Sequence, residues 1–323
     1  MYVITGGAGF LGSALVWHLN QRGVDNIIVV DNLAHSEKWK NLVNRRYVDY
    51  IHKDAFIAMV RRNALPFHLK GVVHLGACSS TTETNADYLM ENNFHYTRDL
   101  CTYALHKGAR FINASSAATY GDGAQGFQAE GEAVYALKPL NMYGYSKHLV
   151  DLWLLRHGLD TSVASLKFFN VYGPNEYHKG DMCSVISKAY TQIQETGCLR
   201  LFKSTAPEYA DGGQLRDFVY VKDCAALMDW LLQQESVCGI RNVGTGQARS
   251  WNDLAAAVFG AMHREVCIEY VDMPVHLHGK YQNFTQADMT WLKGSACPVP
   301  WHGLEAGVRD YVQNYLAGAD AYL

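Results

Sequence analysis

The chain has 323 residues, of which 49% are hydrophobic and 18% are charged, and its formal net charge is −3 at pH 7. This length exceeds the usual size of a single core, and the apolar share excludes a disordered protein, so we expect two closely packed parts. The small negative charge gives no electrostatic reason to expect a nucleic acid or an anionic membrane as partner. No run of about 18 apolar residues occurs, which argues against a transmembrane helix.

Eight cysteines are spread along the chain without a C-x-x-C pair, and several, such as Cys101 and Cys224, lie in apolar stretches. The first residues lack the charged and apolar segments of a signal peptide. We therefore expect reduced, mostly buried thiols in a cytoplasmic protein rather than a disulfide framework. Metal-ligand spacing is also missing, so no metal site is predicted.

The first 31 residues carry the pattern of a dinucleotide-binding unit. Residues 2–5 are a short apolar run, and apolar residues at helical spacing follow a glycine cluster. Residues 26–31 are a second apolar run that ends in Asp31, where a carboxylate can accept a hydrogen bond from a ribose 2′-hydroxyl. Such glycines allow a tight turn and let a helix N-terminus face the pyrophosphate. They are Gly6, Gly9 and Gly12.

Apolar runs at 71–75, 110–114 and 162–168 alternate with helix-compatible stretches at 86–107 and 144–157. Continuous apolar strands separated by helices are typical of a parallel sheet that is covered on both faces. The sequence therefore predicts an α/β protein with a Rossmann-type, doubly wound parallel sheet.

After residue 169 the pattern changes to turns and shorter runs, with an alternating strand at 216–221 and Asp223 as a possible helix N-cap. We expect a smaller C-terminal α/β substrate domain that is interleaved with the first. The Rossmann domain is predicted at 1–169, with return segments near 217–245 and 284–290. The substrate domain is predicted at 170–216 and 246–323.

Tyr143 and Lys147 are four residues apart and therefore share one face of a helix. A free phenol has a pKa of about 10, and a neighbouring ammonium lowers that pKa toward neutrality, which suits acid–base work. The lysine can also reach the nicotinamide ribose. Ser116 follows the 110–114 strand, at the edge where ligands bind in open α/β sheets, and its hydroxyl can hold a substrate oxygen.

These features together resemble the extended short-chain dehydrogenase/reductase family over essentially the whole chain. The resemblance implies a Rossmann domain, a smaller C-terminal substrate domain and a nucleotide-diphosphate sugar as substrate. The matching features are Gly6, Gly9, Gly12, Asp31, Ser116, Tyr143, Lys147 and the segments 170–174 and 216–223.

Within this family the chain looks most like the epimerases that invert C6″ of an ADP-heptose for the lipopolysaccharide core. In that group the residues matching Tyr143 and Lys179 are the acid–base pair; C6″ is oxidised to a carbonyl and the hydride returns to the opposite face. The cofactor stays tightly bound and is recycled. From the residues alone, a phosphate-binding or solvent-exposed loop lysine is the favoured interpretation of Lys179, and the resemblance favours catalysis instead. The matching segments are 30–33, 76–83, 113–120, 170–174 with 178–180, and 281–288.

The resemblance leaves the cofactor open between NADP and NAD. Asp31 alone favours NAD, because a carboxylate repels a 2′-phosphate. Lys38 and Lys53 match family positions associated with NADP, and Asn32 would share the contact, so we expect NADP with NAD also usable. The residues implied to contact the cofactor are Gly6, Gly9, Phe10, Leu11, Gly12, Asp31, Asn32, Lys38, Lys53, Leu75, Gly76, Ala77, Cys78, Ser79, Asn92, Tyr143, Lys147, Val171 and Lys179.

A second set of residues is implied to bind the substrate. An arginine fork suits a diphosphate, and an aromatic ring suits a base or ribose. Asp181 and Lys188 depart from the family pattern, which points to a different substrate pose. The set is Ser79, Ser116, Asn170, Asp181, Lys188, Phe202, Lys203, Ser204, Thr205, Arg216 and Tyr281.

Three other functions compete with this interpretation. Dehydratases of the family carry an Asp-Glu pair after the active-site serine or threonine, whereas Ala117 and Ala118 stand here. A 4-epimerase remains open on residue chemistry. A regulator that only senses the dinucleotide has no need for Ser116, Tyr143 and Lys147 together. Helices flanking such sheets commonly pair subunits, so we expect a homo-oligomer.

Overall fold

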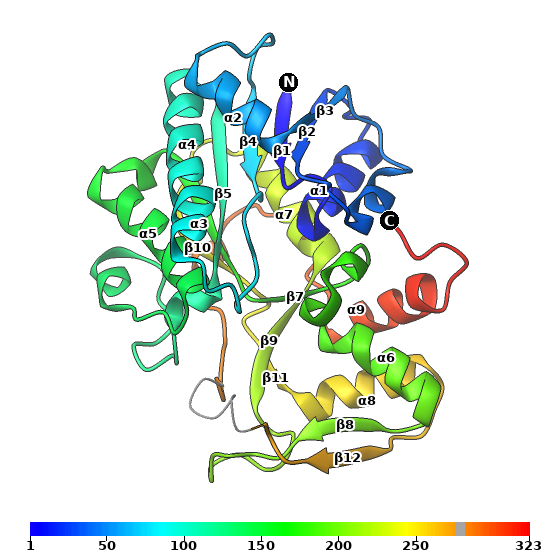
Figure 1. The fold of residues 1–323 in the computed structure, drawn as a ribbon. Helices are drawn as coiled ribbons and strands as arrows, with labels where there is room; N and C mark the ends of the chain where they lie inside the picture. The colour runs from blue at the N-terminus through cyan, green and yellow to red at the C-terminus, as the bar shows by residue number, and fades with distance from the viewer. Residues whose placement is uncertain (275–281) are drawn as a thin grey trace.

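The computed structural model describes residues 1–274 and 282–323 (Figure 1). Seven parallel strands form its largest sheet, in the order β10-β6-β5-β4-β1-β2-β3. The chain runs outward from β1 to one side and then returns to β4 and runs to the other side, so the strand order reverses between β1 and β4. The strands are β1 (Tyr2–Thr5), β2 (Ile27–Asp31), β3 (Asp49–His52), β4 (Gly71–His74), β5 (Arg110–Ser116), β6 (Val163–Phe168) and β10 (Gly239–Val243).

Helices cover both faces of this sheet (Figure 1). Successive residues of a strand point to opposite faces, so Ile4 joins the core beneath one helical layer and Val3 joins the core beneath the other. Both residues are fully buried. The predicted doubly wound parallel sheet is therefore confirmed. One layer holds α1 (Phe10–Gln21) and α7 (Val221–Gln233), and the other holds α2 (Lys53–Arg61), α4 (Tyr96–His106) and α5 (Met142–Arg156).

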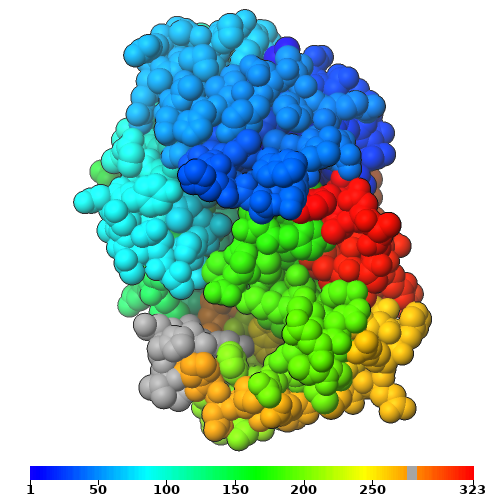
Figure 2. Space-filling model, turned by 45° about the vertical axis from the view of Figure 1, so that its right-hand side comes forward, coloured from blue at the N-terminus to red at the C-terminus, as the bar shows by residue number. Residues whose placement is uncertain are grey.

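Two small sheets and three helices form the smaller C-terminal part. Their shared core also takes in Phe10 and Ala14 from α1, so this part packs directly on the Rossmann part. Figure 2 shows the green middle of the chain in contact with the blue N-terminal part and with the yellow to red C-terminal part. The sheets are β11 (Ala248–Ser250)–β9 (Leu215–Tyr220)–β7 (Asn170–Tyr172) and β12 (Ile268–Val271)–β8 (Leu199–Phe202), and the helices are α6 (Val185–Thr196), α8 (Trp251–Ala261) and α9 (Leu304–Tyr311).

β10 pairs with β6 in the large sheet, which agrees with a return of the chain to the Rossmann part. We propose the predicted domain boundaries on that basis. In the described residues no helix is both long and apolar enough to cross a membrane.

The predicted strands at 2–5, 26–31, 71–75, 110–114 and 162–168 are confirmed within one or two residues. The stretch 86–107 contains α3 (Ala86–Leu89) and α4, joined by wider helical turns at Met90–His95. β3 was not predicted, because its residues at the sheet edge are only partly buried and carry no apolar run.

The prediction of Asp223 as a helix N-cap is wrong. The helix α7 already begins at Val221, so Asp223 lies inside its first turn. Its buried carboxylate instead accepts a hydrogen bond from the backbone nitrogen of His302, 2.7 Å away, and lies 2.6 Å from the His302 ring nitrogen Nδ1. Tertiary structure therefore uses this acid in place of a local cap.

The expectation that all thiols are reduced is wrong for two cysteines. Cys198 and Cys267 form a disulfide, and the other cysteines are free. The strands β8 and β12 pair with Leu199 opposite Ile268, which brings the preceding cysteines together. The two residues lie 69 positions apart in the sequence, so no local spacing announces the pair.

The close approach of α1 to the turn after β1 gives a first test. A Cβ atom on Gly12 would lie 2.1 Å from the carbonyl oxygen of Gly6, which is backbone and cannot move aside. We expect Gly12→Ala to lower the free energy of unfolding by about 1–3 kcal/mol. The matched control is Gly260→Ala, because Gly260 lies exposed in α8 with no atom within 4 Å of the added Cβ. In thermal unfolding, Gly260→Ala should leave the free energy of unfolding unchanged or raise it by up to about 1 kcal/mol. Equal free energies of unfolding for the two variants would contradict the packing argument.

Candidate functional site

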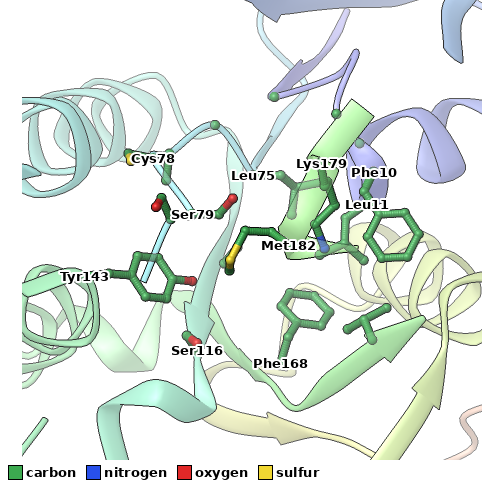
Figure 3. Close-up of a pocket in the computed structure, with 18 of the residues that line it drawn as sticks. Phe10, Leu11, Leu75, Cys78, Ser79, Ser116, Tyr143, Phe168, Lys179 and Met182 are labelled. Carbon is green, nitrogen blue, oxygen red and sulfur yellow. The ribbon is translucent and has the colours of Figure 1, made fainter. Parts of the chain in front are cut away.

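A cavity of about 830 Å³ opens at the carboxyl edge of the large sheet, where the strand order reverses. Its walls come from the turn after β1, the end of β2, the loop after β4, the end of β5, the start of α5 and the segment 168–186. This volume and position are typical of a ligand site in an open α/β sheet. Figure 3 shows the cavity with Tyr143 and Ser116 on one side and Phe10 and Lys179 on the other.

The turn between β1 and α1 forms a cradle for an anion. Gly6 has a φ of 65°, a left-handed conformation that glycine adopts without strain. Gly9 is the N-cap of α1 and has no side chain to satisfy the first amides of that helix. Those amides and the positive end of the helix dipole point into the cavity wall, which fits the pyrophosphate of a dinucleotide.

Asp31 ends β2 beside this cradle, and both of its carboxylate oxygens have partners. The amide of Ala8 donates to Oδ2 at 2.9 Å, and the Lys38 ammonium lies 2.6 Å from Oδ1. Lys53 lies farther along the same wall, where its ammonium donates to the side chain of Asn92 at 2.8 Å. The acid that alone would favour NAD is therefore paired with a cation.

Tyr143 and Ser116 meet because α5 approaches the segment after β5 closely. A Cβ atom on Gly144 would lie 2.7 Å from the carbonyl oxygen of Ala118, so only glycine permits this contact. Burial raises the pKa of Tyr143 above its usual value, and a hydrogen bond with Ser116 partly opposes that rise. The phenol therefore keeps its proton at neutral pH in the protein alone.

Lys147 lies one turn after Tyr143, and its ammonium donates to the carbonyl oxygen of Ala114 at 2.7 Å. Burial lowers the pKa of Lys147 to about 8, and the negative charge of Asp151 opposes this fall. The cavity thus holds a lysine whose charge changes near physiological pH. The sequence predicts that Lys147 lowers the pKa of Tyr143, whereas in the structure burial of the phenol raises that pKa.

The wide helical turns at Met90–His95 tie the loop after β4 to α5. Asn93 accepts from the amide of Cys78 at 2.8 Å and donates to its carbonyl oxygen at 3.0 Å. The same side chain donates to the Ser146 hydroxyl at 3.0 Å. Wider turns of this kind recur at functional sites, and here they fix the loop against the helix of Tyr143.

Lys179 lies in the short helical segment Tyr177–Met182, and its ammonium is 5.0 Å from the centre of the Phe10 ring. In Figure 3 Lys179 lies beside Phe10 and Leu11, and Met182 lies between it and Tyr143. Its neighbour His178 has a pKa lowered to about 4 by burial and by the charges of Lys38 and Lys179. The structure therefore brings Lys179 into the same cavity as Tyr143 but sets its ammonium over Phe10.

Every residue predicted to contact the cofactor lines this cavity, and so do three of the predicted substrate residues, Ser79, Ser116 and Asn170. Tyr281 lies outside the described residues. The remaining predicted substrate residues do not line the cavity. They are Asp181, Lys188, Phe202, Lys203, Ser204, Thr205 and Arg216.

Two of these residues contact each other. The Lys188 ammonium donates to the backbone carbonyl oxygen of Asp181 at 2.6 Å. Lys203 pairs with Asp272 at 2.9 Å. Arg216 lies 5.7 Å from the ring centre of Trp251, which does line the cavity. Arg216 therefore contacts the cavity indirectly, through the Trp251 ring that forms part of the cavity wall.

Sequence reasoning missed the apolar lining of the cavity. Of these residues only Phe168 and Phe218 lie in predicted strands, and only Phe168 ends such a strand at the ligand-binding edge. The others come from helices and loops with no pattern of their own. The lining includes Phe168, Met182, Ile186, Phe218, Trp251 and Leu254.

Comparison with known proteins agrees with this geometry. A protein of Nitratidesulfovibrio vulgaris (strain DP4) named ADP-L-glycero-D-manno-heptose-6-epimerase is 63% identical over 100% of both chains. A protein of the same name from Fusobacterium nucleatum is 45% identical, again over 100% of both chains. The crystal structure of the Helicobacter pylori ADP-L-glycero-D-manno-heptose-6-epimerase superposes with a TM-score of 0.80 at 29% identity, covering 97% of this chain and 95% of that one.

The sequence model of the NAD dependent epimerase/dehydratase family matches residues 2–244, which include the anion cradle, Ser116, Tyr143 and Lys147. This chain belongs to the NAD dependent epimerase/dehydratase family.

Proposed function

We propose that this chain is an epimerase that inverts C6″ of ADP-D-glycero-D-manno-heptose to give ADP-L-glycero-D-manno-heptose for the lipopolysaccharide core. One observation carries the proposal: a single cavity joins a dinucleotide cradle to Tyr143, Ser116 and Lys147. The names of the relatives at 63% and 45% identity support the choice of sugar.

The glycine turn after β1 and Lys147 would hold a nicotinamide dinucleotide, and this cofactor would supply the hydride chemistry that inverts C6″. Ser116 holds the reacting oxygen, and Tyr143 carries its proton. Because burial raises the Tyr143 pKa, the phenol begins as a proton donor, and positive charge brought close by ligand binding turns it into a base. Lys147 is positioned to hold the nicotinamide ribose.

A 4-epimerase is the second candidate, since the same groups would serve at another carbon. The relatives' names favour inversion at C6″. Elimination of water is disfavoured, because Ala117 and Ala118 follow Ser116 where a dehydratase carries acids.

NMR of candidate nucleotide sugars incubated with the purified protein and no added cofactor tests the function. We expect the L-glycero epimer to form from ADP-D-glycero-D-manno-heptose and no 4-epimer to form from UDP-glucose. Tyr143→Phe should bind the cofactor normally and lose turnover by about 10²–10⁴-fold, because only the titrating oxygen is removed. Formation of a 4-epimer alone, or normal turnover by Tyr143→Phe, would contradict the proposal.

We also propose that Lys179 serves as the second acid–base group, on the face of C6″ opposite Tyr143. Inversion requires proton handling on two faces, and Lys179 and Tyr143 lie on different sides of the cavity (Figure 3). Since the Lys179 ammonium lies over Phe10, the segment Tyr177–Met182 would have to shift when the sugar binds.

Lys179→Met keeps the side-chain length and removes the ammonium. We expect kcat for epimerisation to fall by about 10²-fold or more while cofactor affinity survives. Lys107→Met is the control, because Lys107 is exposed at the end of α4, outside the cavity, with its ammonium 5.4 Å from the centre of the Tyr103 ring. If Lys179→Met raises KM and leaves kcat unchanged, Lys179 only anchors phosphates and Tyr143 is the sole base.

For the cofactor we propose NADP, with NAD also usable, held tightly and recycled. The pairing of Lys38 with Asp31 supports this preference, because it neutralises the carboxylate that would repel a 2′-phosphate. The family description and the shape of the cradle support a nicotinamide dinucleotide in general.

Lys38→Met should weaken NADP by about one to two powers of ten, the size of a lost charge-assisted contact, and should leave NAD unchanged or tighter. Asp31 then becomes free to accept the ribose hydroxyl of NAD. Lys40→Met controls for the loss of a nearby charge, since Lys40 pairs with Glu37 outside the cavity. Fluorescence titration measures both affinities; equal weakening of NAD and NADP would show that Lys38 does not recognise the phosphate.

We propose the cytoplasm as the compartment, supported by the free thiols apart from the Cys198–Cys267 pair. We propose a homo-oligomer as well. Exposed Trp39, Val43 and Val48 line one shallow surface hollow, and exposed apolar residues grouped in this way favour subunit contact.

A further inference from the structure

A charged pair lies completely buried behind the proposed reacting groups. The ammonium of Lys167, on β6, is 2.8 Å from the Asp151 carboxylate, on α5, and both side chains have 0% exposure. Neither residue lines the cavity. No local pattern predicts this pair, because Lys167 lies within a strand that is otherwise mostly apolar.

Both charges are satisfied by hydrogen bonds. Asp151 accepts from the hydroxyl of Ser115 at 2.7 Å and from that of Ser165 at 2.9 Å. Lys167 also donates to the hydroxyl of Thr119 at 2.7 Å, and its ammonium lies 4.9 Å from the centre of the Tyr120 ring. The pair thus joins β5, β6, α5 and the segment after β5 into one network.

This network holds the backbone on both sides of Ser116. Ser115 directly precedes Ser116, and the Thr119 hydroxyl donates to the Ser116 carbonyl oxygen at 2.8 Å. On α5, Asp151 follows Lys147 by four residues and Tyr143 by eight, so all three lie along one helical face. Movement of the Asp151 carboxylate would therefore displace Ser116 relative to Tyr143.

Stability alone does not account for such a pair. Removing two charges from water costs several kcal/mol each, and well-packed apolar residues of similar volume stabilise a core equally well or better. The position of the two charges beside the Ser116 backbone indicates a role at the cavity instead.

We propose that Asp151 and Lys167 are a positioning pair for the reaction, which fixes Ser116 against Tyr143 and places the Asp151 carboxylate one helical turn after Lys147. This inference rests on the proposed function for its kinetic part only, since the charge of Lys147 can be followed without any substrate.

The charges around Lys147 predict the direction in which its pKa changes when Asp151 is replaced. The groups that face it are Asp151 from its own helix, Cys78 from the loop after β4 and His74 from β4. The pKa of His74 is lowered to about 3 by burial, so this ring is neutral at working pH. Asp151 raises the pKa of Lys147 more than Cys78 does, so removal of the Asp151 charge should make Lys147 lose its proton at lower pH.

Asp151→Asn tests this directly by two measurements. The first is the ¹³C shift of the Lys147 Cε, assigned with Lys147→Arg and titrated with pH; we expect a midpoint near 8 in the parent protein and a lower one in the variant. The second is kcat against pH; we expect the alkaline limb to move to lower pH and kcat to fall by about one to two powers of ten, as for misplaced reacting groups.

Asp229→Asn is the matched control. Asp229 is also a nearly buried helical acid, paired with His18 at 3.1 Å and Arg22 at 2.5 Å, but it lies in α7 on the other face of the sheet. The Asp229→Asn substitution should lower the melting temperature without changing the midpoint of the Lys147 titration or the alkaline limb of kcat against pH. A variant of Asp151 that loses stability to the same degree yet keeps both values would overturn the proposal.

If Asp151→Asn fails to fold, two further variants keep the proposal open to test. The double variant Asp151→Leu with Lys167→Leu leaves no unpaired charge and should fold, yet show a lower Lys147 midpoint and a low kcat. Ser115→Ala retains both charges, so it should lower kcat with an unchanged Lys147 midpoint.

Parent-like kcat in both would overturn the positioning role. Absence of epimerisation by the parent protein would instead count against the proposed function, and the Lys147 titration would still decide the electrostatic claim.

Discussion

All strands of the large sheet run in the same direction, and this constraint brings the site together. Parallel strands end at one edge, so the residues that follow β1, β2, β4 and β5 converge on one cavity although they are far apart in the sequence. The reversal of strand order between β1 and β4 separates the flanking loops there and leaves room for a ligand. The glycine turn supplies the anion cradle at this point, and Tyr143 approaches from α5 to face Ser116.

Charge within the site is controlled by pairing each buried ion with a partner. Asp31 is paired with Lys38, and Asp151 with Lys167, while the buried Lys147 ammonium donates to a backbone carbonyl. Burial raises the pKa of Tyr143 and lowers that of Lys147 to about 8. The shift of Lys147 places its titration near physiological pH, whereas Tyr143 keeps its proton until a positive charge approaches.

Local patterns in the sequence predict the fold, and the residues proposed to bind the cofactor lie together at one cavity. The glycine turn lies between a strand and the helix that follows it, and it contains Gly6, Gly9 and Gly12. Tyr143 and Lys147 are separated by one helical turn. A short segment of sequence is therefore enough to predict each of these features. Contacts between distant segments remained hidden. The pair Asp151–Lys167 joins a helix to the following strand through the interior, and Cys198–Cys267 spans 69 residues. The local sequence around Asp223 predicts an N-cap whether or not His302 lies nearby, so the prediction fails where tertiary structure supplies the partner. The substrate side was the least predictable, because apolar lining such as Trp251 has no signature.

We propose that one hydrogen leaves C6″ and returns to the same carbon within the cavity. The most direct measurement uses ADP-D-glycero-D-manno-heptose labelled with one deuterium on C6″, with the reaction run in ordinary water and the product followed by NMR. Our account predicts that the L-glycero product keeps the deuterium at C6″, because the hydrogen is removed and returned as a hydride and never exchanges with solvent. Loss of the label to water would show that C6″ exchanges its hydrogen as a proton, and would contradict the account.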